Sequence, residues 1–62
     1  IDIVEIELRL GGLYLLVENF EEGFSHLRKA LGLNFKAQAI LKEYFPRVFK
    51  MKEVKEIINE FK

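Results

Sequence analysis

The stretch LRLGGLYL, residues 8–15, decides the predicted fold, because two adjacent glycines stand between two runs of alternating side chains. Successive glycines supply the positive φ that a two-residue hairpin turn requires. With Gly11 and Gly12 at the centre of such a turn, the aliphatic residues on either side pair across two strands and share one face. A phosphate-binding loop would instead need a helix directly after the glycines. We therefore predict a β-hairpin over residues 3–18 with one aliphatic face.

Three helices are predicted after the hairpin, over residues 20–31, 35–45 and 51–61, with a turn over residues 46–50 before the third. Asn19 followed by Glu22 is typical of a helix N-cap with its capping-box partner. Gly32 is typical of a left-handed helix end. Asn34 predicts a second N-cap, and Pro46 ends the helix that follows it.

The predicted fold class is α+β, in the order strand, strand, helix, helix, helix, with the helices covering the aliphatic face of the hairpin. The 62 residues suffice for one small domain with a marginal core, and no cysteine is present for a disulfide or a thiolate metal site. The dominance of Glu and Lys among the charged residues is typical of a thermophile protein or a design. Because the sequence contains neither an apolar run long enough to span a bilayer nor a signal-like start, we expect a soluble, cytoplasmic chain without a membrane partner.

The outer edges of the predicted hairpin have no partner strand, which favours pairing with a second copy. Residues 1–25 carry six acidic residues against one arginine, whereas residues 26–55 carry eight basic residues against two acidic ones. Opposite charge on the two halves also favours association. The sequence thus predicts a non-catalytic interaction or oligomerisation module that pairs through its hairpin edges as a homodimer or binds another protein. Its candidate interface residues are Glu5, Glu7, Tyr14, Leu16, Glu18, Phe35 and Ala39.

The residues that could carry catalysis are isolated from one another. By helical spacing His26 reaches only Glu22, and we expect it to be solvated on the surface. Ser25 and His26 are neighbours on a helix and point about 100° apart, so they cannot act as nucleophile and base. Glu5 and Glu18 face each other across the predicted hairpin, but on a flat surface without a pocket. We therefore predict no enzymatic activity, no metal site, no cofactor and no small-molecule substrate.

The stretch HLRKALGLNFKAQAILKEYF, residues 26–45, resembles a helix-turn-helix, and this resemblance gives the alternative function. Arg28 and Gln38 stand where such motifs usually have a small residue and a branched aliphatic residue. The Leu-Gly-Leu-Asn sequence within it is equally typical of a helix end followed by a new N-cap. The resemblance implies nucleic-acid contacts by Arg28, Lys29, Lys36, Gln38 and Lys42. The third hypothesis is a designed or excised domain with no activity of its own.

Overall fold

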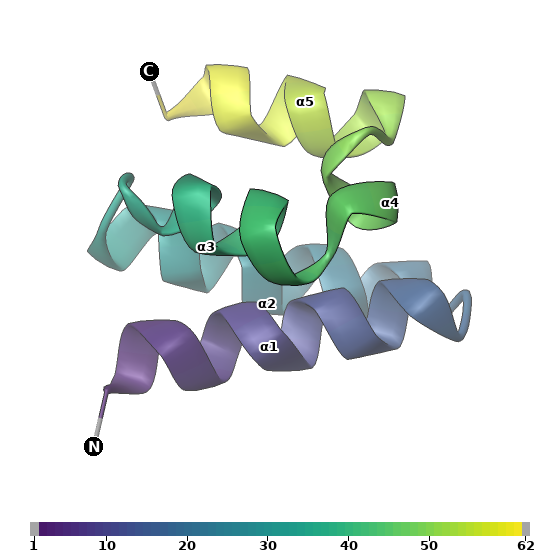
Figure 1. Ribbon diagram of the computed structural model, residues 1–62, viewed down its shortest axis with the longest axis horizontal. Coiled ribbons are helices and arrows are strands. Elements are labelled where there is room, and N and C mark those ends of the chain that lie inside the picture. Colours follow the sequence, from purple (N-terminus) through teal and green to yellow (C-terminus); the bar gives the residue numbers. More distant parts are fainter. Residues whose placement is uncertain (1, 62) are drawn as a thin grey trace.

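Five helices make up the computed structural model of the protein, which describes residues 2–61 (Figure 1). Helices α1 and α2 form an antiparallel pair, and α3 packs on that pair mainly through α1. Helix α5 contacts α2 and α4 on the side of the molecule away from α1. The predicted α+β class is therefore wrong. The helices are α1 (Ile3–Leu16), α2 (Phe20–Leu33), α3 (Ala37–Tyr44), α4 (Pro46–Phe49) and α5 (Lys52–Glu60).

The predicted β-hairpin over residues 3–18 is wrong because α1 runs through Gly11 and Gly12 without a break. Neither glycine has a positive φ, so neither reverses the chain. Apolar residues dominate this segment so strongly that it matches the two-residue period of a strand and the period of a helix at once. The structure adopts the helical period, with Leu8 and Leu15 buried beside the two glycines on one helix face.

The glycines of α1 and α2 allow close packing instead of turning the chain. A Cβ atom on Gly11 would lie 3.1 Å from the carbonyl oxygen of Gly23 and 3.1 Å from the backbone nitrogen of Leu27, both on α2. A Cβ atom on Gly12 would lie 2.6 Å from the ring of Phe45. Glycine costs about 1 kcal/mol relative to alanine in a helix interior. Here that cost is offset by the close approach of α2 to α1.

A Schellman motif joins α1 to α2. The backbone N–H of Asn19 donates to the carbonyl oxygen of Tyr14 (2.9 Å), and the N–H of Glu18 donates to that of Leu15 (3.1 Å). Glu18 has a φ of 63°, a left-handed conformation that glycine usually occupies. Asn19 is the N-cap residue of α2, as predicted, although its side chain makes no capping hydrogen bond.

The later helices lie close to their predicted positions, with differences at their ends. Gly32 does not end its helix, because α2 continues to Leu33 and the glycine has no positive φ. The prediction of Asn34 as an N-cap is wrong, because α3 begins at Ala37 and its N-cap residue is Lys36. The side chain of Asn34 instead accepts a hydrogen bond from the backbone N–H of Lys36 (3.0 Å) in the turn before α3. The predicted turn over residues 46–50 is largely the one-turn helix α4, which starts at Pro46.

The core lies between the α1–α2 pair and the three later helices. Its buried residues are all apolar, and no polar side chain is buried among residues 2–61. On α5 the buried residues Val54, Ile57 and Ile58 recur at helical spacing. The core residues are Leu8, Leu15, Leu27, Ala30, Leu31, Ala37, Leu41, Val48, Val54, Ile57 and Ile58.

Candidate interaction surface

Helix α1 carries a second apolar face on the side opposite the core. The residues of this face recur at alternating intervals of three and four, which are the a and d positions of a heptad. At 100° per residue they fall within a sector of about 80° whose centre points away from Leu8 and Leu15. We refer to this face as the outer stripe, and it consists of Ile3, Ile6, Leu10, Leu13 and Val17.

The outer stripe is exposed for most of its length. The exposed fractions are 63% for Ile3, 45% for Ile6, 55% for Leu13 and 72% for Val17, while Leu10 is half-buried. Single exposed aliphatic residues are common on protein surfaces, whereas a continuous row of them marks an interaction site. Because the row covers α1 from one end to the other, the outer stripe is a candidate interaction site.

An apolar groove of about 450 Å³ lies beside the outer stripe at the C-terminal half of α1. Only aliphatic and aromatic residues line it, namely Leu10, Leu13, Tyr14, Leu16 and Val17. Two neighbouring grooves share its residues: one contains Leu13 and Tyr44, and the other contains Leu16, Tyr44 and Arg47. The C-terminal half of α1 is thus the centre of a larger apolar surface.

Charged side chains on both flanks of the outer stripe have polar partners. On one flank, Arg9 donates to the carboxylate of Glu5 (2.8 Å) and its guanidinium lies 5.2 Å from the ring centre of Tyr44. On the other flank, Nδ1 of His26 lies 2.7 Å from a carboxylate oxygen of Glu7. The apolar stripe is therefore bordered by polar groups, which is the arrangement of many protein interfaces.

The prediction of a solvated His26 is wrong. Its side chain is only 17% exposed. The carboxylates of Glu7 on α1 and Glu22 on α2 lie beside its two ring nitrogens, and the ring of Tyr14 stacks on the imidazole with 5.5 Å between the ring centres. Glu22 is the more distant carboxylate, at 3.8 Å. Within residues 2–61, no group of three or more side chains is arranged to hold a metal ion. His26 thus links α1 to α2.

The predicted interface residues do not form one surface. Glu5 and Glu18 do not face each other, because the first lies in the first turn of α1 and the second lies in the turn after its end. Leu16 is exposed and lines the apolar groove, whereas Phe35 packs partly buried against the core. Ala39 is exposed on α3 and does not line the apolar groove of α1.

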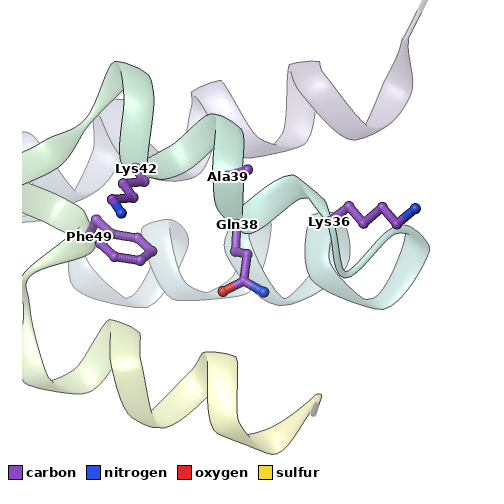
Figure 2. A pocket seen from close by; sticks show the side chains of 5 residues that line it. All are labelled: Lys36, Gln38, Ala39, Lys42 and Phe49. Carbon is purple, nitrogen blue, oxygen red and sulfur yellow. The ribbon is translucent and has the colours of Figure 1, made fainter.

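The five predicted nucleic-acid contacts divide between two surfaces. Lys36, Gln38 and Lys42 line a groove of about 460 Å³ on α3 together with Ala39 and Phe49, and we call it the α3 groove (Figure 2). Figure 2 shows Lys42 directed toward the ring of Phe49, from whose centre its Nζ atom lies 5.9 Å, while Lys36 extends away. The remaining two residues, Arg28 and Lys29, line a different groove beside Ile3, and Arg28 pairs with Glu60 at 3.4 Å.

Sequence reasoning missed all five outer-stripe residues, since the hairpin interpretation assigned four of them to the buried aliphatic face and did not use Ile3. The signal that identifies the stripe is the alternation of three- and four-residue intervals from Ile3 to Val17. A strand cannot produce a stripe with that spacing, because its side chains alternate every two residues.

Residues 2–61 form a small all-helical domain in which the outer stripe of α1 is left uncovered. Comparisons with protein-family models, with curated proteins and with solved structures found no match. Within residues 2–61, no helix has both the length and the apolar character needed to cross a membrane.

Proposed function

We propose that the protein is a non-catalytic self-association module in which two copies pair through the outer stripe of α1. The observation that carries the proposal is the continuous exposed row from Ile3 to Val17 on the face opposite the core. An apolar helix face normally packs against another element, and of the two apolar faces of α1 only the inner one does so within residues 2–61. This surface replaces the hairpin edges of the sequence prediction, since α1 occupies that segment as a helix.

A second copy suits the outer stripe because a heptad pattern is complementary to itself. In a twofold dimer the same patch is used by both subunits, so the patch must fit its own image. Residues at a and d positions fulfil this requirement, because the side chains of one helix enter the spaces between those of the other. From Ile3 to Val17 the stripe is about 21 Å long at 1.5 Å per residue. The longest extent of the molecule is 25 Å, so two α1 helices would cover each other along almost the whole molecule.

The chemistry of the groove supports binding over catalysis. Its lining contains no carboxylate, imidazole, amine or hydroxyl other than that of Tyr14. Arg9 and Glu7, which flank the outer stripe, are engaged by Glu5 and His26. A partner would therefore meet an apolar centre and a polar rim, which is typical of protein–protein contacts.

Analytical ultracentrifugation of the wild-type chain and two variants tests the proposal. We expect the average mass of the wild-type protein to rise toward that of a dimer between low micromolar and millimolar concentration. Leu13→Glu removes a side chain that is 55% exposed in the single chain. Losing its burial from both copies costs about 2 kcal/mol, or about thirtyfold in the dissociation constant, before the cost of burying the new carboxylate.

Ala39→Glu is the matched control, because it adds the same charge at an exposed position of the α3 groove. We expect it to associate like the wild type, with both variants retaining the helical circular dichroism of the parent. A wild-type protein that stays monomeric up to millimolar concentration would refute the proposal. So would a folded Leu13→Glu variant that dimerises as tightly as the control.

Nucleic-acid binding by the α3 groove is the second candidate function. The observation in its favour is that Lys36 and Lys42 line one groove and neither forms a salt bridge within residues 2–61. Unpaired lysines beside an aromatic ring suit a phosphate backbone with unstacked bases. The outer stripe remains the stronger candidate, because its residues form a continuous pattern over the whole of α1.

A fluorescence anisotropy titration with single-stranded and duplex DNA at two salt concentrations tests the second candidate. We expect affinity to fall as salt rises, and Lys42→Gln to reduce the slope of that dependence by about one. Lys29→Gln is the control, since Lys29 lies in a different groove. Binding that ignores salt, or an equal effect of the two substitutions, would exclude the α3 groove as the site.

A further inference from the structure

We infer that the two α1 helices pair antiparallel, with the twofold axis between Leu10 and Leu13; this inference rests on the proposed self-association. An antiparallel coiled-coil contact brings a positions of one helix against d positions of the other. In this register Leu10 lies against Leu13 of the second copy, and Ile6 lies against Val17 of the second copy. The centre of the pair then coincides with the apolar groove, whose lining includes both leucines.

The flanking charges oppose a parallel pair. In a parallel coiled coil the g position of one helix lies beside the e position of the next heptad in its partner. Here these positions are Asp2 and Glu7, so the carboxylates of the two copies would face each other on both sides of the pair. The remaining acidic residue of this end, Glu5, would add to the repulsion. All these like charges gather at one end only if the helices run in the same direction.

An antiparallel pair keeps the N-terminal ends of the two α1 helices apart. In the register given above, Asp2 lies opposite position 21 of the second copy, beyond the C-terminal end of α1. The closest flanking pairs are then Arg9 with Leu16 and Glu7 with Tyr14 of the second copy. Neither flank between the two antiparallel α1 helices brings two carboxylates together, whereas the parallel pair does so on both flanks.

Single-cysteine variants distinguish the two directions, because the chain contains no cysteine of its own. In the antiparallel register, position 6 lies opposite position 17 of the partner. Two copies of position 6 are then separated by about 16 Å along the helices. A disulfide needs Cα atoms closer than about 7 Å, so it can form only between the two different variants. Ile6 and Val17 are both exposed, which makes the substitutions compatible with folding.

Ile6→Cys and Val17→Cys are oxidised in a glutathione buffer, separately and as an equimolar mixture, and the products are identified by intact mass. We expect the mixed disulfide to form at least about ten times faster than either symmetrical one. Faster symmetrical crosslinking at position 6 would overturn the antiparallel arrangement. So would the absence of a disulfide from all three samples while the protein sediments as a dimer. Those results leave the self-association proposal intact, which only a monomeric wild-type protein or an unaffected Leu13→Glu variant would refute.

Discussion

Gly23 of α2 provides the sharpest test of the packing between α1 and α2. A Cβ atom at this position would lie 2.6 Å from Cγ and 3.1 Å from the backbone nitrogen of Leu15. Leu15 is only 4% exposed, so it has no free space to move into. Overpacking a core costs about 1–3 kcal/mol, and the backbone contact favours the upper part of that range. The gain in helix propensity from glycine to alanine returns about 1 kcal/mol. We expect Gly23→Ala to lower the free energy of unfolding by about 1–2 kcal/mol.

Gly32→Ala is the control for this experiment, because it makes the same substitution in the same helix. Its Cβ atom would lie 3.6 Å from the ring of Phe61, which is an ordinary van der Waals contact. We expect this variant to gain about 0.5–1 kcal/mol. Far-ultraviolet circular dichroism follows the thermal and urea denaturation of both variants. Their thermal midpoints should differ by about 10 °C for a domain of this size. If Gly23→Ala were as stabilising as Gly32→Ala, the two helices would not approach each other at Gly23 and the described packing would be refuted.

Four further substitutions or conditions follow from the same structure. Glu18→Gly should raise the free energy of unfolding by about 0.5–1 kcal/mol, because glycine adopts the φ of 63° without steric cost; a loss in urea denaturation would contradict the left-handed turn. Leu27→Ala should lower it by about 2–5 kcal/mol, since Leu27 is fully buried, and a loss below about 1 kcal/mol would exclude it from the core. Glu5→Gln breaks an exposed ion pair with Arg9 and should change stability by less than about 0.5 kcal/mol in the same assay; a larger loss would mean that the pair is shielded from solvent. The thermal midpoint should rise with chain concentration in the wild type but not in Leu13→Glu, because dimerisation stabilises only the folded state. A midpoint independent of concentration in calorimetry would argue against the dimer.

The sequence predicted the later helices well because their apolar residues follow one period only. On α5, Val54, Ile57 and Ile58 recur at helical spacing among charged residues, and all three are buried. The start of α2 could be predicted from Asn19 because the helix signal lies within one turn of the chain. Such local signals need no knowledge of which other segment packs against the helix.

Helix α1 could not be predicted in the same way because local signals favoured the wrong structure. Gly11 and Gly12 each lower helix propensity, and the residues around them alternate as in a strand. What decides in favour of the helix is a contact with Gly23 and Leu27 of α2, more than ten residues along the chain. Tertiary packing outweighs a local cost of about 2 kcal/mol for two glycines.

The polar pairs of the candidate surface were hidden for the same reason. Glu7 is nineteen residues from His26, and only the antiparallel packing of α1 on α2 brings the carboxylate to the ring. Arg28 is likewise thirty-two residues from Glu60. The lysines of the α3 groove could be grouped from sequence, since Lys36 and Lys42 are close in the chain and belong to one short segment.

The two faces of α1 differ in a way that explains both the failed fold prediction and the proposed function. The inner face uses glycines, which let α2 and Phe45 approach closely, and the outer face carries Ile, Leu and Val side chains that need a partner of their own. All four other helices lie on the inner side, so no other helix within residues 2–61 covers the outer stripe. In a domain this small, apolar surface left in water contributes nothing to folding stability. Pairing of two α1 helices would convert that surface into a second core. The residues that would form it are the aliphatic side chains whose spacing fits a strand as well as a helix.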